Sequence, residues 1–296
     1  MTARQAPPLR LAALAWPVGR GEAFAAKLAR WCDRAVAEGA GMLLLPEYAP
    51  CENAFATGGG ALAERDAAVA EADALVAAME GEARRTGLWI AGGTVLRRNG
   101  GRIVNAAPLV SPDGVVGLQE KHCRTRFERS AWRLAAGAAP SVFATPWGVI
   151  GIAVCYDAEF PPLVRAQVLA GAWLVLVPAA TDTAAGATRV TVSARARAIE
   201  NQCVVAVAPT VGAAGWCESL DSNRGRAGIY GPADRGFPDD GILAEGAPDT
   251  AGLVVATLDP ARIAAVRRRG AVTNHADWPD APLPPSPVLG RGARAA

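Results

Sequence analysis

Three side chains with complementary chemistry each follow an apolar run in this sequence: Glu47, Lys121 and Cys155. A thiol is a nucleophile that needs a base within hydrogen-bond reach, and a carboxylate is such a base. An ammonium group stabilises the oxyanion that forms when a carbonyl carbon is attacked. The three residue types together suit acyl transfer, provided that the fold brings them to one place.

The stretch around Cys155 predicts how the thiol is positioned. Residues 149–154 are apolar without alternation, which is typical of a strand that is covered on both faces. Residues 161–172 have a helical pattern that begins with two prolines, and residues 173–177 form a second buried strand. This unit puts Cys155 at the carboxyl end of a strand, where open α/β sheets bind their ligands. A cysteine in this position is also a common core residue.

The other two groups are predicted to follow strands as well. Glu47 comes after the buried run 42–45, and Lys121 comes after the strand 115–120. A glutamate in such a place is most often a solvated loop residue. The chain has only two lysines, Lys27 and Lys121, against 28 arginines. A lysine retained in so arginine-rich a chain suggests a need for a compact ammonium group.

The remaining pattern alternates strands and helices, with hairpins between some of the strands, which indicates an α/β fold with a mixed sheet. We expect hairpin turns at residues 99–101 and 111–114. Further strands are expected at 9–16, 88–96, 102–110, 142–143, 204–208, 228–230, 242–245 and 253–258. Helices are expected at 22–38, 61–85, 188–202 and 260–269, with loops at 48–60 and 122–140.

Composition excludes several classes of function. The 296 residues are 51% hydrophobic and carry a net charge of +2, so neither nucleic acid nor a membrane is an expected partner. No run is long enough to span a membrane, and residues 9–18 lack a signal-peptide cleavage site, so we expect a cytoplasmic protein. Six scattered cysteines and two histidines favour neither disulfides nor a metal site. No metal and no organic cofactor is expected.

Several motifs resemble the signature stretches of the nitrilase (carbon–nitrogen hydrolase) superfamily, in the same order and at similar separations. The three main ones are Leu-Leu-Pro-Glu47, Glu120-Lys121 and Cys155-Tyr-Asp-x-Glu-Phe-Pro161. Weaker matches are residues 195–202, residues 225–232 with Ala227 in place of a serine, and a loop that carries a second glutamate, Thr125-Arg-Phe-Glu128. The 125–128 loop, residues 236–241 and Asp277-Trp278 look most like an amidase-like branch.

One motif departs from the family pattern. The family often has Lys-x-His after the strand, whereas here His122 follows Lys121 directly and Cys123 stands at the usual histidine position. We therefore transfer no role to His122.

The resemblance implies a fold and a mechanism. The fold is a nitrilase-like αββα four-layer sandwich with mixed sheets. Glu47 would take the proton of Cys155, and the thiolate would attack a small linear amide to leave a thioester. Lys121 and the backbone N–H of Tyr156 would stabilise the oxyanion. A carboxylate can act as base for a thiol only if its own pKa is raised, as burial does, or if the pKa of the thiol is lowered, as we expect Lys121 to do. A mostly exposed Glu47 would weaken this mechanism.

The resemblance implies less about the substrate. Glu128 would orient Lys121 or the incoming amide, and its alternative is a surface residue of an arginine-rich loop. Asp182 and Arg189 are candidates for lining the substrate pocket. Substrate choice is expected to depend on loops 48–60, 122–140 and 179–188.

Rival functions stay open at this stage. Within the superfamily they are a nitrilase, an N-carbamoyl-amide hydrolase and an acyltransferase that uses the thioester. A Cys-His protease would need His122 or His275 beside the thiol, and a binding or scaffold relative would have an inactive site. We expect one catalytic domain over residues 1–280, followed by a Pro-rich tail over 281–296. The resemblance also implies a homodimer or larger homo-oligomer that uses the helix at 188–202.

Overall fold

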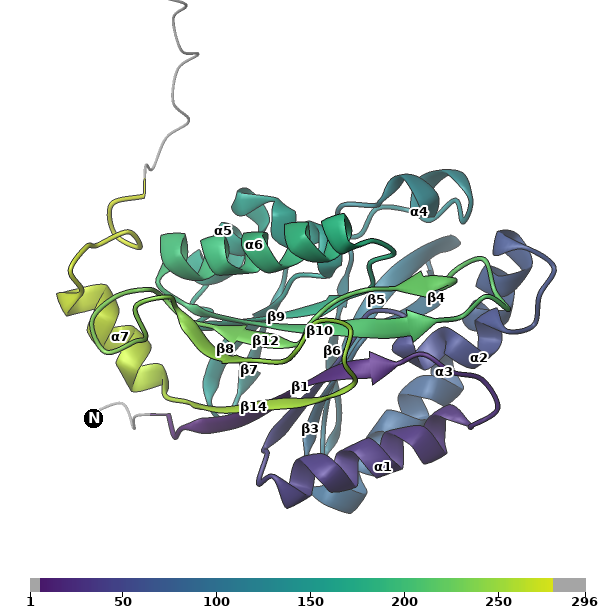
Figure 1. The fold of residues 1–296 in the computed structure, drawn as a ribbon, viewed down its shortest axis with the longest axis horizontal. Helices are drawn as coiled ribbons and strands as arrows, with labels where there is room; N and C mark the ends of the chain where they lie inside the picture. The colour runs from purple at the N-terminus through teal and green to yellow at the C-terminus, as the bar shows by residue number, and fades with distance from the viewer. Residues whose placement is uncertain (1–5, 279–296) are drawn as a thin grey trace, which may run out of the picture.

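A computed structural model describes residues 6–278, and its strands form one curled, mixed sheet (Figure 1). The central strand β1 (Leu9–Pro17) pairs over residues 9–15 with β14 (Gly252–Leu258) and over residues 11–13 with β2 (Met42–Leu45). It meets β10 (Val204–Ala213) only through Trp16 and Pro17. The sheet therefore divides there into two halves. The first half also contains β3 (Trp89–Gly92), β4 (Val95–Asn99), β5 (Arg102–Ser111), β6 (Gly114–Glu120) and β14 (Gly252–Leu258). The second contains β7 (Val142–Thr145), β8 (Gly148–Ile152), β9 (Leu174–Ala179), β10 (Val204–Ala213), β11 (Ser222–Asn223), β12 (Gly228–Tyr230) and β13 (Ile242–Glu245).

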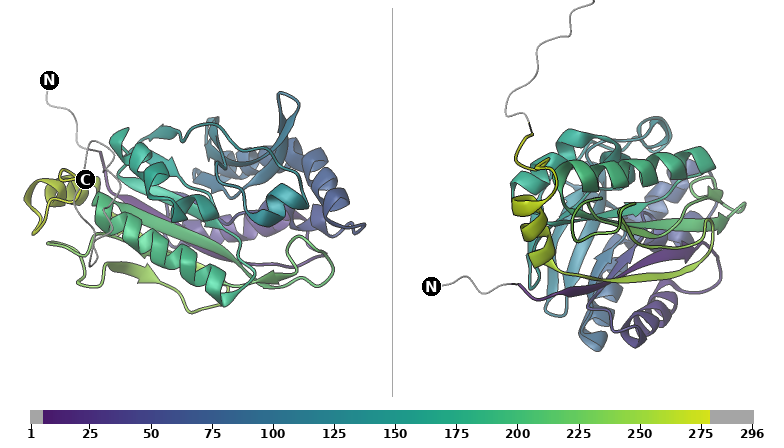
Figure 2. Two further views of the ribbon diagram at one scale, coloured as in Figure 1. Left: turned by 90° about the horizontal axis from the view of Figure 1, so that it is seen from above. Right: turned by 60° about the vertical axis from the view of Figure 1, so that its left-hand side comes forward.

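Helices cover the outer faces of the two halves (Figures 1 and 2). The helices α1 (Phe24–Ala37) and α3 (Ala61–Thr86) lie on the first half, and α5 (Pro161–Leu169) and α6 (Ala184–Asn201) lie on the second. The shorter elements are η1 (Ala49–Cys51), α2 (Glu52–Phe55), α4 (Arg126–Ser130), η2 (Cys155–Glu159) and α7 (Pro260–Arg269). The αββα four-layer fold expected from the sequence is confirmed.

The alternation of side chains along β1 explains the layers. Successive side chains of a strand point to opposite faces. Leu11 and Ala13 pack into a core shared with the second half of the sheet, whereas Ala12 and Leu14 pack into the core beneath α1 and α3. Strand β1 therefore contributes buried apolar surface to both cores, and this burial stabilises the fold.

Several predicted elements are confirmed. The predicted strand 42–45 and helix 260–269 have the expected bounds, and β4 and β5 join in a hairpin at residues 99–102. Helix α6 begins four residues before the prediction. Among residues 6–278, no helix is both long and apolar enough to cross a membrane. The predicted tail at 281–296 lies outside the described residues.

Two predictions of local structure are wrong. The expected strand 88–96 is two strands, β3 and β4, which pair with successive segments of the same edge of β5, opposite the edge that pairs with β6. The break falls at Gly93, which has φ of +65° and lies so close to Pro46 that a Cβ atom would sit 2.0 Å from its carbonyl oxygen. The expected loops 48–60 and 122–140 contain η1 and α2, and α4, respectively.

Candidate active site

Cys155 lies where strand β8 gives way to the short helix η2. The strand runs parallel to β9, so its carboxyl end is at the sheet edge that the sequence predicted. Cys155 has φ of 49°, a left-handed conformation that costs a non-glycine residue about 1 kcal/mol or more. The residue is 4% exposed, and its Sγ lies 3.6 Å from the carbonyl oxygen of Ala180. The backbone strain and the buried thiol mark a residue that the surrounding structure holds in one conformation.

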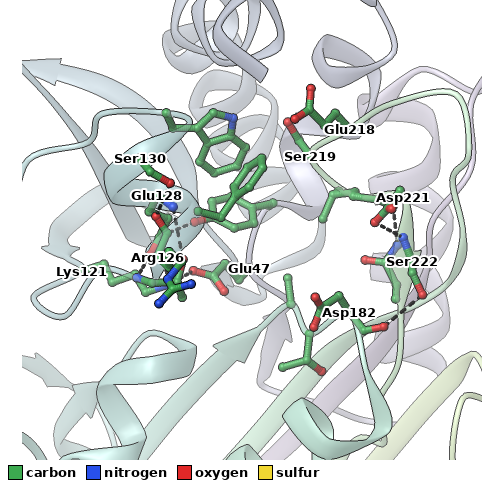
Figure 3. Close-up of a pocket in the computed structure, with 18 of the residues that line it drawn as sticks. Glu47, Lys121, Arg126, Glu128, Ser130, Asp182, Glu218, Ser219, Asp221 and Ser222 are labelled. Carbon is green, nitrogen blue, oxygen red and sulfur yellow. Dashed lines mark hydrogen bonds and ion pairs between the residues drawn. The ribbon is translucent and has the colours of Figure 1, made fainter. Parts of the chain in front are cut away.

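Lys121 follows β6 and carries its ammonium group into a fully buried cluster. Its backbone N–H donates to the carbonyl of Asn105 in the adjacent strand β5, at 2.8 Å. Its Nζ lies 2.9 Å from Oε1 of Glu47 and 3.0 Å from Oε1 of Glu128 (Figure 3). Desolvation of the ammonium lowers the pKa of Lys121, but the two carboxylates outweigh it and raise this pKa well above its ordinary value. The lysine is therefore a permanent cation between two carboxyl groups.

Glu47 follows β2 and is 1% exposed, which meets the condition that the sequence-based mechanism set. Its Oε1 accepts a hydrogen bond from Nδ2 of Asn105 at 2.8 Å, and its carboxylate raises the pKa of the nearby Cys155 thiol. Burial raises the pKa of Glu47 above its usual range, against the effect of Lys121. A carboxylate with a raised pKa is better matched to the proton of a thiol.

Glu128 belongs to the start of α4 and is 2% exposed, so the alternative of a surface glutamate is wrong. It forms a capping box with Thr125: its Oε2 accepts the backbone N–H of Thr125 at 2.6 Å, and its own N–H donates to the threonine hydroxyl. Burial alone would raise the pKa of Glu128, but Lys121, the hydroxyl of Tyr48 and the Thr125 N–H together lower it.

The thiol of Cys155 is protonated in the resting site. Burial and the nearby Glu47 raise its pKa well above the ordinary value, and Lys121 only partly opposes them. The sequence-based expectation that Lys121 lowers this pKa is right for the effect of the lysine, but burial and Glu47 have the larger effect and raise the pKa. A thiol in this form must lose its proton before its sulfur can act as a nucleophile.

Tyr156 is the second residue of η2, a position where a backbone N–H has no partner within the helix. This agrees with the use of its N–H as an oxyanion donor, which stays a prediction.

A cavity of about 670 Å³ leads to the cluster, and both pocket candidates from the sequence, Asp182 and Arg189, lie on its wall. Lys121 and Glu47 form part of its wall, and so does Ala180, whose carbonyl contacts the thiol. Arg189 pairs with Glu159 at 3.4 Å and its side chain is 61% exposed, so it lies near the mouth. Figure 3 shows Asp182 on the opposite side of the cavity from Glu128.

Three residues of the site were missed or misjudged from the sequence. Tyr48 and Asn105 hydrogen-bond the buried carboxylates, but a tyrosine after a glutamate and an asparagine within a strand carry no recognisable signal. Asp157, two residues after Cys155, is the third. Its carboxylate accepts the backbone N–H groups of His122 at 3.1 Å and Cys123 at 2.6 Å, so it ties the loop after Lys121 to η2.

Neither histidine accompanies the thiol. The ring of His122 is exposed and its Nδ1 contacts the carbonyl of Ala138, while His275 lies beside Arg165 and Gln202. The Cys-His protease alternative therefore lacks its base. Within residues 6–278, no three His, Cys, Asp or Glu side chains gather as metal ligands would.

The other lysine, Lys27, lies outside the site. Its ammonium is buried between the carboxylate of Glu52 and the ring of Trp16. Both lysines of the chain are thus buried cations, but only one of them faces the cavity.

The chain belongs to the carbon–nitrogen hydrolase family, whose model matches residues 2–268. Among curated relatives, a probable hydrolase YhcX of Bacillus subtilis (strain 168) is 36% identical over 183 residues, which are 62% of this chain and 36% of that protein. Deaminated glutathione amidase of Yersinia enterocolitica is 34% identical over 145 residues, 44% of this chain and 50% of that protein. Each match thus spans half or less of the relative's length.

Solved structures share the fold. Nit3 of Saccharomyces cerevisiae, a member of the nitrilase superfamily, aligns with a TM-score of 0.73 at 22% identity, over 89% of this chain and 94% of that one. A double mutant of the amidase from Nesterenkonia sp. AN1 in complex with acrylamide aligns with a TM-score of 0.68 at 25% identity, over 90% of this chain and 97% of that one. The resemblance to the nitrilase superfamily is confirmed.

Proposed function

We propose that this protein is an amidase that cleaves a small linear amide through a thioester on Cys155. The observation that carries the proposal is the buried cluster in which one ammonium group lies 2.9 Å from Glu47, while the same carboxylate acts on the pKa of the buried Cys155 thiol. A nucleophile, a base and a cation for the oxyanion are the parts that amide cleavage requires.

The proposed reaction begins with transfer of the thiol proton to Glu47 as Sγ of Cys155 bonds to the amide carbon. The carbonyl oxygen becomes an oxyanion, which Lys121 and the backbone N–H of Tyr156 stabilise. The protonated Glu47 then gives its proton to the leaving nitrogen as the carbon–nitrogen bond breaks, and ammonia or an amine departs. Water, deprotonated by Glu47, attacks the thioester and releases the acid and the thiol. One carboxyl group alternates between base and acid.

Comparisons with relatives support an amide rather than another substrate. The Nesterenkonia amidase binds acrylamide, and another of its structures carries the acetamide moiety of fluoroacetamide on the active-site cysteine. Several curated relatives are omega-amidases, such as that of Danio rerio at 28% identity over 43% of this chain. An assay must separate this function from four alternatives: a nitrilase, an N-carbamoyl-amide hydrolase, a thioester-dependent acyltransferase and an inactive binding relative.

The assay measures ammonia release from a panel of ω-amides, carbamoyl amides and nitriles by the native protein and by Cys155→Ala. We expect release from ω-amides and none from the variant. Faster conversion of nitriles than of amides would show that the protein is a nitrilase rather than an amidase. Equal release by the two proteins would refute the role of Cys155. No release, together with an acyl adduct in the intact mass, would indicate transfer to an acceptor other than water.

We further propose that residues 1–280 form one catalytic domain in the cytoplasm and that the protein is a homodimer joined through α5 and α6. Three large apolar side chains on these helices are exposed in the single chain: Leu169, Val192 and Ile199. Apolar side chains grouped on neighbouring helices are typical of an interface. Light scattering of the native protein and of Val192→Asp tests the dimer, and a monomeric native protein would contradict it.

A further inference from the structure

Two buried carboxyl groups contact one ammonium group in the candidate site. Any difference between the two carboxyl groups must therefore come from their other hydrogen-bond partners. Oε1 of Glu47 and Oε1 of Glu128 lie 2.9 and 3.0 Å from Nζ of Lys121. If both glutamates are ionised, Lys121 and the two carboxylates together carry a net charge of −1. Because the cluster is buried, this charge favours protonation of one of the two carboxylates. The ammonium distances do not decide which one does.

The hydrogen-bond donors around the two glutamates differ. Glu128 accepts the backbone N–H of Thr125 on Oε2 and the hydroxyl of Tyr48 on Oε1. Glu47 accepts Nδ2 of Asn105 at 2.8 Å, and the same nitrogen lies 3.2 Å from Oε1 of Glu128. Donors aimed at a carboxylate favour its charged form. The charge is therefore held more firmly on Glu128 than on Glu47.

The structure fixes the direction of the hydroxyl of Tyr48. Nδ2 of Asn105 donates to the phenol oxygen at 2.7 Å, which leaves the hydroxyl proton for Glu128. The backbone N–H of Tyr48 donates to the hydroxyl of Thr94 at 3.0 Å, and its φ of 59° is left-handed. Its ring packs edge-on against Trp132, with centroids 5.0 Å apart. A residue held this tightly, at a conformational cost, acts as a fixed donor.

We propose that Tyr48 is a positioning residue: its hydroxyl keeps Glu128 as the lasting counter-ion of Lys121, which reserves the other glutamate for proton transfer. This inference rests on the proposed function for its kinetic readout. It goes beyond that function by explaining why two glutamates at nearly equal distances from one lysine have different roles, one as a counter-ion and one in proton transfer.

The first test is the dependence of kcat/KM on pH for Tyr48→Phe. Without the phenol donor, Glu128 takes a proton more readily, so the acid limb of the profile should move up by about one pH unit, while KM stays nearly constant. Tyr230→Phe is the matched control, because it removes a buried hydroxyl that hydrogen-bonds Glu245 at 2.9 Å, away from the cavity. A rise in KM with an unmoved acid limb would mean that Tyr48 contacts the substrate, and would overturn the proposal.

A double-mutant cycle separates this role from simple packing. If Tyr48 acts through Glu128, then Tyr48→Phe should not move the acid limb further in a Glu128→Gln background. Equal shifts in both backgrounds would refute the inference. Replacing tyrosine by 3-fluorotyrosine keeps the ring and makes the phenol a stronger donor, so it should move the limb to lower pH even if the phenylalanine variant folds poorly.

Alkylation of Cys155 by chloroacetamide keeps the test independent of amide turnover. Its rate follows thiol deprotonation in the same cluster. A shift of the alkylation profile in Tyr48→Phe, in a protein that cleaves no amide, would uphold the role of Tyr48 and refute the amidase. Unchanged alkylation profiles in a protein that does cleave amides would refute the role of Tyr48 alone.

Discussion

Replacing Lys27 by methionine should destabilise the protein because it leaves a buried carboxylate without its cation. Nζ of Lys27 lies 2.9 Å and 3.0 Å from the two oxygens of Glu52, and 4.5 Å from the centre of the Trp16 ring. The side chains of the pair are 5% and 0% exposed. Methionine fills a similar volume, so the change isolates the ammonium group from the packing of the stem.

The expected loss is about 3 kcal/mol at pH 7. Removing one partner of a buried pair costs about 3–5 kcal/mol. We take the lower end because Glu52 keeps two donors, Nε1 of Trp16 at 3.0 Å and the backbone N–H of Gly19 at 3.1 Å. With an unfolding entropy of about 2.1 cal/mol/K per residue, 296 residues give roughly 0.6 kcal/mol/K, so Tm should fall by about 5 °C.

The loss should depend on pH in a defined direction. Burial already raises the pKa of Glu52, and removing Lys27 raises it further. In the variant, folded Glu52 keeps its proton at pH values where the unfolded chain, with a pKa of about 4.3, has released it. The variant should therefore be closest to the native protein near about pH 4.5 and fall behind as pH rises.

Thermal unfolding from about pH 4.5 to 8 tests this reasoning. Lys27→Met combined with Glu52→Gln should recover part of the loss, because no charge is then buried alone. Arg30→Met is the control: it removes an exposed pair with Glu22 at 2.7 Å and should cost at most about 1 kcal/mol. A native-like Tm at pH 7, or a deficit that is equal at every pH, would refute the argument.

Two further changes test how the site is positioned. Gly93→Ala should destabilise the protein by about 3 kcal/mol or more, because its Cβ would meet the Pro46 carbonyl, whereas Gly81→Ala, in an open part of α3, should be neutral or stabilising by about 0.5–1 kcal/mol. Tm measurements check both, and equal effects would contradict the geometry. Asp157→Asn should lower kcat/KM about ten- to a hundred-fold with little change in Tm, because it loosens the link between η2 and the loop after the lysine. An unchanged kcat/KM would show that this link is dispensable.

Much of the layered fold could be predicted because its signals are local. Apolar runs such as 42–45, the turn residues at 99–101 and the proline that begins the helix at 260 each mark an element through its own residues. The strand ends that carry the catalytic candidates could be located for the same reason. Their resemblance to known motifs predicted the roles that we propose.

What could not be predicted depends on contacts between distant segments. Gly93 interrupts an apolar run because the backbone of Pro46 lies against it, and nothing within residues 88–96 records that contact. Asn105 hydrogen-bonds two glutamates that lie 58 and 23 residues away in the chain, and nothing in its own strand records those contacts. The helix α4 was predictable, since Thr125 and Glu128 have the spacing of a capping box.

The capping box of α4 separates positions with a structural role from positions that only line the cavity. Thr125 and Glu128 begin the helix, and Glu128 also pairs with Lys121, so a change at Glu128 would affect both the helix and the charged cluster. Arg126 and Phe127, between them, line the cavity, and neither side chain is part of the capping box. New substrate preferences could therefore evolve by exchange of these two side chains, while the machinery behind them is inherited unchanged.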